Sequence, residues 1–236
     1  DGIGHTVWKL EDESAIYAIA HLFDGVNALY IADGHHRTAS AVRYGQARRA
    51  QAKDATGEEP FEYFMAVVFP HNQLKIMDYN RVVKDLNGLT KAQFLAKVGE
   101  KFDVAPSAER NPKAPASFGM YLDGQWYSLK AKPGSYPASD PVRSLDVSIL
   151  QENLLNPILG IQDPRTDKRI DFVGGIRGMD ELERRVKEGM AFAFSMYPTS
   201  LVQLMDVADA GKIMPPKSTW FEPKLRSGLL VRIYEG

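Results

Sequence analysis

Five consecutive residues combine the groups best suited to chemistry. They are Asp33-Gly34-His35-His36-Arg37, followed by Thr38, and they stand where a short apolar run gives way to a helix-forming segment. The first N–H groups of a helix have no acceptor within it, and the helix dipole adds partial positive charge at the same end. A phosphate or another anion fits that position. The sequence therefore predicts an anion site at this turn.

The side chains of the turn divide by charge. Arg37 could bind an anion through two N–H groups, His35 and His36 could donate hydrogen bonds, and Thr38 offers a hydroxyl. Asp33 differs, because a carboxylate repels an anion unless it binds a metal ion or accepts a proton from a substrate hydroxyl.

A purely structural interpretation of the same residues stays open. Asp33 would cap the helix, Gly34 would relieve backbone strain, and the two histidines would be solvated. Adjacent histidines before an arginine, in a chain with five histidines, weigh against this alternative without removing it. A histidine metal site is less favoured, because adjacent side chains diverge and no further ligand cluster is visible.

Periodicity and turn residues predict the elements that would hold this turn. Apolar spacing of three and four, together with helix-forming composition, predicts helices over 11–23, 38–52, 90–102, 146–155, 179–187 and 199–210. Short apolar or alternating runs predict strands over 7–10, 28–32, 61–69, 74–79, 118–122, 125–129, 170–173, 191–196 and 229–234. Asp123-Gly124 joins two of them as a hairpin. We therefore expect an α+β fold with a mixed, largely antiparallel sheet and flanking helices.

Composition limits the classes of function. The chain has 236 residues, enough for one large or two small domains, and its net charge of −1 gives no general attraction to nucleic acid. No cysteine is present, which excludes thiolate chemistry and fits the cytoplasm, where we expect the protein. No apolar stretch approaches the roughly 20 residues of a membrane span. The first residue is not Met, so the chain is either processed or part of a longer protein.

Two further segments offer accessory ligand contacts. Asn80 and Arg81 are at a predicted strand end, where an exposed, ion-paired turn is an equal alternative. Lys217-Ser218-Thr219 precedes two aromatic residues and would suit a nucleotide or a small polar substrate. The alternative for this loop is that its aromatic rings cover the core.

Four motifs resemble those of the bacterial and archaeal family called domain of unknown function 1015. The segment Tyr30–Ala41 closely resembles the family signature, and the resemblance continues through His5–Leu10, Tyr79–Leu86 and Lys217–Leu229. It covers essentially the whole chain. Family members are generally longer at the N-terminus, so the chain resembles their C-terminal part.

The Asp-Gly-His-His-Arg core is also similar to a motif of the ParB/sulfiredoxin superfamily, which includes free-serine kinases. This resemblance implies a ParB/sulfiredoxin-like core over 1–104, with 105–236 packing on it, or else one continuous domain. It implies phosphate contacts from Gly34, His35, His36 and Arg37, with Asp33 near the reacting hydroxyl or a Mg²⁺ ion. Those kinases also use an upstream acidic residue, which neither Glu11 nor Glu13 can be matched to.

The resemblance favours a nucleotide-dependent phosphotransferase that acts on a small hydroxylated metabolite with Mg²⁺ and a nucleotide such as ATP, ADP or CTP. Asp33, His35 and His36 would be catalytic. The alternative is a regulatory module that senses a nucleotide without turnover. The sequence predicts neither membrane nor nucleic-acid partners, and it identifies neither the substrate nor the oligomeric state.

Overall fold

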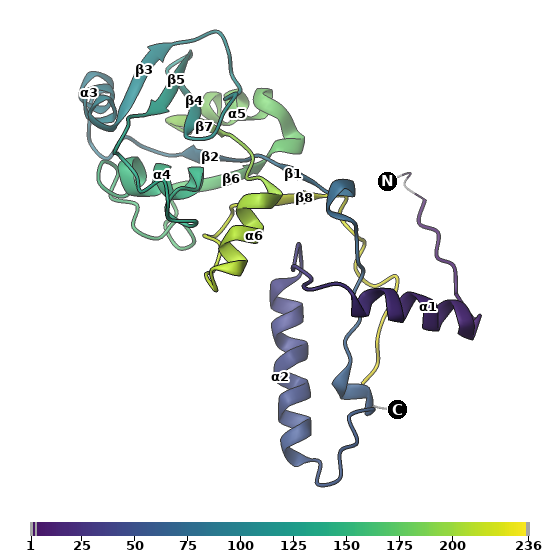
Figure 1. Cartoon of the computed structure of the whole chain (residues 1–236). Helices are drawn as coiled ribbons and strands as arrows, with labels where there is room; N and C mark the ends of the chain where they lie inside the picture. The colour runs from purple at the N-terminus through teal and green to yellow at the C-terminus, as the bar shows by residue number, and fades with distance from the viewer. Residues whose placement is uncertain (1, 3, 235–236) are drawn as a thin grey trace.

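The computed structural model describes residues 2 and 4–234 and shows a layered body from which an arm projects (Figure 1). The arm contains α1 (Glu13–Asp24) and α2 (His35–Gln51). In the body, the helices are α3 (Lys91–Lys101), α4 (Asp146–Leu150), the π-helical η3 (Gln151–Leu155), α5 (Gly178–Lys187) and α6 (Leu201–Asp209). Among these residues, no helix is long and apolar enough to cross a membrane.

A six-stranded sheet forms the centre of the body. Its order is β3-β5-β4-β7-β2-β6, and every neighbouring pair is antiparallel. The strands are β2 (Tyr79–Val83), β3 (Phe102–Pro106), β4 (Ser117–Leu122), β5 (Gln125–Ala131), β6 (Ile170–Gly174) and β7 (Phe192–Met196). The predicted α+β class with a largely antiparallel sheet is confirmed.

The sheet is buried on both faces because its strands carry apolar residues at successive positions. On β7, Phe192 and Phe194 pack with α3 and α4, while the intervening Ala193 faces α5. Side chains alternate across a strand, so two cores form on the two faces. Arg81 lies on the α4 face of β2, in register with Phe172 and Phe194.

Local signals predicted several element boundaries well. Asp123 and Gly124 both have positive φ, as a type I′ hairpin turn between β4 and β5 requires. Thr90 caps α3 through the N–H of Gln93. Gly211 follows α6 with φ +65°. The predicted strand 74–79 is instead two strands, since β1 (Lys75–Met77) ends before β2 begins.

Four predicted strands are wrong. Residues 7–10, 28–32, 61–69 and 229–234 form no strand, apart from a short 3₁₀ turn, η1 (Pro60–Glu62), that overlaps the third. Their composition favours extended backbone, but a strand also needs a partner for its N–H and C=O groups. None of the residues that the structure describes pairs with these segments.

A small second sheet connects the arm to the body. Strand β1 pairs with β8 (Trp220–Glu222), which the sequence did not predict, and Ile76 and Phe221 pack with Leu204 of α6. Tyr30 and Ala32, just before the predicted site, pack against the same cluster. The start of α2 is therefore held against the body by the segment that precedes it.

The sheet combines strands from both sides of the predicted domain division. Strand β3 spans the proposed limit between residues 104 and 105, and β2 pairs with β6 and β7. This arrangement favours the alternative of one continuous domain for the body. The division at 104 remains a prediction for the arm.

Candidate functional site

The turn before α2 is anchored from the body. The hydroxyl of Tyr30 donates to Asp209 Oδ1 at 2.7 Å, which fixes the approach to the turn. Gly34 then reverses the chain with φ +85°, a conformation that costs other residues about 1 kcal/mol or more. Helix α2 begins three residues earlier than predicted, so His35, His36 and Arg37 form its first turn.

The start of α2 has no side-chain cap. Gly34 is the N-cap residue, and the first helical hydrogen bond runs from the Thr38 N–H to the Gly34 carbonyl at 2.9 Å. Asp33 therefore does not cap the helix, so the structural alternative considered for this turn is wrong. The N–H groups of the first turn face an exposed surface that also carries His35, His36 and Arg37. This is the geometry of an anion site.

Asp33 lies between two cations. Its carboxylate is 3.6 Å from the Arg37 guanidinium and 3.6 Å from Lys224 Nζ. Arg37 also reaches the Ser227 hydroxyl at 3.3 Å. Lys224 and Ser227 belong to the C-terminal motif, and their approach to Asp33 and Arg37 could not be deduced from spacing, because almost 200 residues separate the pairs.

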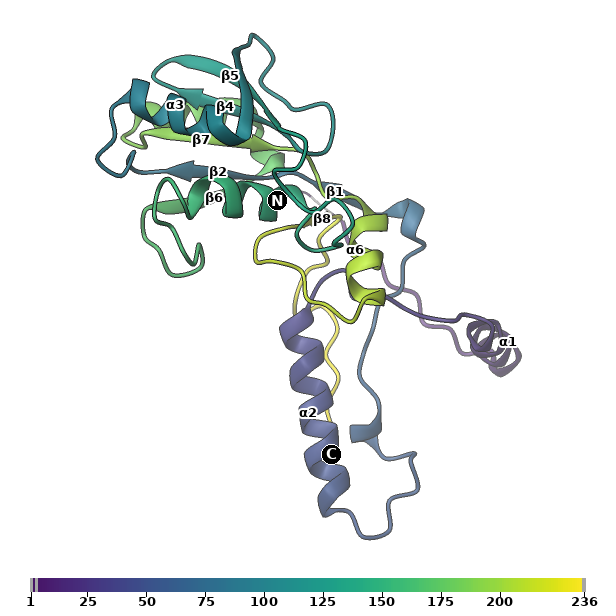
Figure 2. The same cartoon turned by 60° about the vertical axis from the view of Figure 1, so that its left-hand side comes forward.

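An open groove runs from this turn along α2. Its volume is about 520 Å³, and it is lined by His36, Arg37, Ser40, Ala41, Tyr44 and Tyr234. The α2 residues share one helix face, because they follow spacings of three to five residues. Tyr44 and Tyr234 close the far end with ring centres 5.2 Å apart, and Figure 2 shows the C-terminal segment running beside α2. Sequence reasoning missed both tyrosines.

The accessory residues lie in the body rather than at the turn. Asn80 is buried, and its amide bonds to Asp78 and to the Met196 N–H. Ser218 is buried too and donates to the Pro215 carbonyl, while Thr219 is half-buried. None of these atoms is directed at α2 by a described contact. Their contribution to a ligand site remains a prediction.

Aromatic rings bridge the turn and the body. Lys224 lies over the Trp220 ring, Trp220 meets Tyr79 edge-on at 5.3 Å, and Tyr79 meets Phe172 edge-on at 5.9 Å. Trp220 packs so closely on Gly174 that a Cβ there would come within 2.6 Å of the ring. Lys217 has a φ of +57°, and its ammonium lies over Tyr79 and Phe172. The predicted loop 217–219 thus forms part of this bridge.

A buried acid and a buried base lie behind the bridge. Asp146 is 5% exposed, one carboxylate oxygen accepts the Ala116 N–H at 2.9 Å, and the other oxygen has no partner. Burial raises the pKa of Asp146 to about 7, although the Ala116 N–H and the charge of Arg81 act in the opposite direction. Burial also lowers the pKa of Arg81 to about 10.

We predict that Asp146 makes the free energy of unfolding fall as pH rises toward 8. Its folded pKa lies above its unfolded value, so the native state holds the proton more tightly. The contribution is fully present below about pH 4 and is lost as pH rises through about 7, at roughly 1.4 kcal/mol for each pH unit between the unfolded and folded pKa values. Urea unfolding of Asp146→Asn, which is always neutral, should lack this slope. A variant that keeps the wild-type slope would contradict the assignment.

The donor set for a metal is limited to Asp33. The described residues contain no group of three or more His, Cys, Asp or Glu side chains that could hold an ion. Mg²⁺ commonly uses only one or two carboxylates and completes its shell with water and substrate phosphates. Asp33 fits that mode if a nucleotide supplies the phosphates. The fit depends on displacing Arg37 and Lys224 from the carboxylate.

Comparison with known proteins gives one family match. The sequence model described as "Protein of unknown function (DUF1015)" matches residues 1–148. No curated protein matches the chain.

Solved structures give distant similarities. A free serine kinase in complex with AMP shares 14% identity at a TM-score of 0.42, over 90% of this chain and 81% of that chain. A mutant free serine kinase in complex with ADP shares 14% at 0.44, over 90% and 81%. A conserved hypothetical protein from Pyrococcus furiosus shares 13% at 0.42, over 89% and 81%. The function is therefore argued from the residues of this chain alone.

Proposed function

The chain belongs to the DUF1015 family of proteins of unknown function, and from this premise we propose that it is a nucleotide-dependent phosphotransferase acting on a small hydroxylated metabolite. One observation carries the proposal. The uncapped start of α2 opens into a groove that ends at two aromatic rings. The two ends suit the two ends of a nucleotide, its phosphates and its base.

The groove has the length that a nucleotide needs. His36 and Tyr44 are eight positions apart on α2, which corresponds to about 12 Å along a helix axis. Phosphates at the first turn would meet the free N–H groups, Arg37 and the histidines. A base at the other end would stack on Tyr44 or Tyr234, because such rings bind flat aromatic ligands.

Asp33 provides the group that acts on the acceptor. Its carboxylate would take the proton of the substrate hydroxyl while the hydroxyl oxygen bonds to the transferred phosphorus, and the bond from phosphorus to the nucleotide oxygen breaks. Arg37, His35 and His36 would hold the phosphoryl oxygens, and Lys224 lies close enough to help. A bound Mg²⁺ would neutralise phosphate charge. Most of the rate enhancement would come from positioning and charge neutralisation.

Calorimetric titration of the purified full-length protein tests the proposal. ATP, ADP and CTP are each added with Mg²⁺, and we expect saturable binding of at least one of them. Phosphorus NMR with a panel of hydroxylated metabolites then detects a phosphorylated product. Failure of all three nucleotides to bind would refute the proposed function.

A regulatory module that binds a nucleotide without turnover is the second candidate. It is favoured by the two cations that already occupy the Asp33 carboxylate, because such a carboxylate is less available as a base. Both candidates require the groove on α2. They differ only in whether Asp33 acts on a second substrate.

A further inference from the structure

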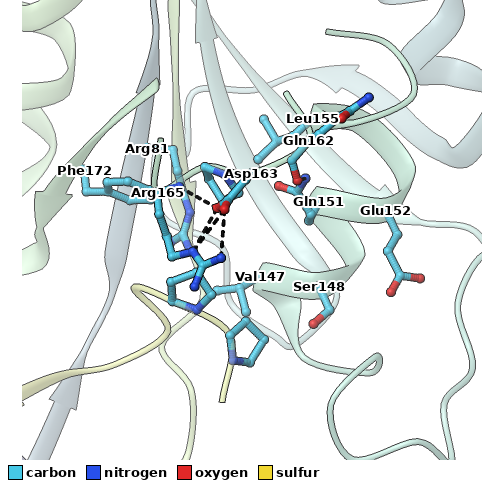
Figure 3. A pocket seen from close by; sticks show the side chains of 13 residues that line it. Arg81, Val147, Ser148, Gln151, Glu152, Leu155, Gln162, Asp163, Arg165 and Phe172 are labelled. Atoms are coloured by element: carbon cyan, nitrogen blue, oxygen red, sulfur yellow. Dashed lines mark hydrogen bonds and ion pairs between the residues drawn. The ribbon is translucent and has the colours of Figure 1, made fainter. Parts of the chain in front are cut away.

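A second cavity lies in the body, separate from the groove on α2. Its volume is about 480 Å³, and the two sites share no lining residue. Arg81 and Phe172 line one side, and Ser148, Gln151 and Leu155 of the α4–η3 segment line the other (Figure 3). The cavity is thus enclosed between the sheet and the helical layer on that face.

Arg81 is a buried cation without an anionic partner in this wall. It is 4% exposed, and its guanidinium donates to two neutral acceptors, the carbonyls of Tyr79 and Lys217. No carboxylate of residues 2 and 4–234 forms an ion pair with it. A buried charge is costly unless it is paired, and a guanidinium has N–H groups beyond these two bonds. The cavity therefore presents a positive charge that a bound anion would neutralise.

Gln151 adds an acceptor that lacks a donor. Its amide nitrogen donates to the carbonyls of Ile161 at 2.7 Å and Gln162 at 3.2 Å. Two carbonyl acceptors fix which end of the amide is nitrogen, because a flipped amide would direct oxygen at oxygen. The Gln151 Oε1 atom is then buried without a partner. A ligand hydroxyl or ammonium group could satisfy it after a small side-chain adjustment.

The remaining charges at the cavity are balanced. Arg165 is ion-paired with Asp163 at 2.8 Å, as the dashed lines in Figure 3 mark, and Glu152 is ion-paired with Arg143. The net charge offered to a ligand is therefore that of Arg81 alone. A monoanion neutralises it, whereas a doubly charged phosphate would leave an excess negative charge near Asp163 and Glu152. The planar guanidinium also matches the two oxygens of a carboxylate.

We propose that this cavity binds a small carboxylate that carries a hydrogen-bond donor, such as a 2-hydroxy acid. The carboxylate would pair with Arg81, and the donor would reach Gln151. The competing explanation is structural, with Arg81 serving only to hold the Lys217 carbonyl and its loop. The two explanations differ in one measurable respect, because only the first makes the cavity respond to a carboxylate.

Titration of the full-length protein with sodium L-lactate, followed by amide NMR without nucleotide, tests the proposal. Sodium chloride at equal ionic strength is the control for salt. We expect saturable shifts at Ser148, Gln151 and Phe172. Sodium acetate, which lacks the hydroxyl, should bind about tenfold more weakly, since one net hydrogen bond is worth roughly that factor.

Two arginine variants complete the test. Arg81→Lys keeps the charge but loses the planar fork, so it should weaken lactate binding about tenfold or more. Arg169→Gln is the matched control, because Arg169 is also partly buried and bonds to a carbonyl but is paired with Asp167 and lies outside the cavity. It should bind lactate as the wild type does.

Several outcomes would overturn the proposal. They are shifts confined to His35–Arg37, no saturable shift at all, equal lactate affinity in Arg81→Lys, or tighter binding of inorganic phosphate than of lactate. If Arg81→Lys does not fold, the shift map of the wild-type protein and its preference for lactate over acetate still decide. Because no nucleotide is present, these outcomes do not depend on the function proposed for α2.

Discussion

Replacement of Arg37 by Gln should weaken nucleotide binding by about a hundredfold or more while the fold is retained. Arg37 is exposed, and its contacts with Asp33 at 3.6 Å and Ser227 at 3.3 Å are long, so its loss costs the folded chain little. In the complex it would make charge-assisted bonds to phosphate. Two such bonds, at about 1.5–3 kcal/mol each, correspond to at least this factor.

The matched control for Arg37→Gln is Arg43→Gln. Arg43 is an exposed arginine of the same helix that does not line the groove. Both variants lower the net charge equally, so a general electrostatic effect would weaken binding in both. Calorimetry should show the loss in Arg37→Gln only. Equal affinities in the two variants would mean that the first turn of α2 does not hold the phosphates.

Local sequence signals predicted the elements whose reasons are local. The Asp123-Gly124 turn, the Thr90 cap and the glycine after α6 each depend on residues within a few positions of one another. The order of strands in the sheet could not be predicted in this way. It depends on pairings such as β2 with β7, which are more than 100 residues apart.

The wrong strand predictions have a single physical cause. Residues 61–69 have the composition of a buried strand, yet a strand is stable only when a neighbour accepts its hydrogen bonds. Composition reports the preference of a segment for extended backbone and carries no information on its partner. Strand β8 shows the reverse case, since three residues form a strand because β1 lies beside them.

The candidate site was predictable in its centre and hidden at its edges. Adjacent histidines, an arginine and a glycine in one turn point to an anion from residue type alone. Lys224 and Tyr234 reach the site only because the C-terminal segment returns to α2. Arg81 was visible as a polar residue, but its burial without an anionic partner could be found only from the packing of α4 against β2.

Replacement of Asp33 by Asn should lower kcat by about a thousandfold or more and leave nucleotide affinity within a few fold of the wild type. Loss of a positioned base costs roughly 10²–10⁴ in rate, and the amide cannot accept the proton of a hydroxyl. Removing the carboxylate also frees Arg37 and Lys224, which lie 3.6 Å from it, to face phosphate. Affinity should therefore be retained or slightly increased.

This variant separates the two functions proposed for the groove. A phosphotransferase loses turnover but keeps binding, so kcat and the dissociation constant change independently, as measured by product formation and calorimetry. A regulatory module keeps binding and shows no product in either protein. If instead Asp33→Asn abolishes nucleotide binding, the carboxylate holds the ligand or its metal ion directly. Asp33 would then belong with the binding residues, and another group would have to deprotonate the hydroxyl.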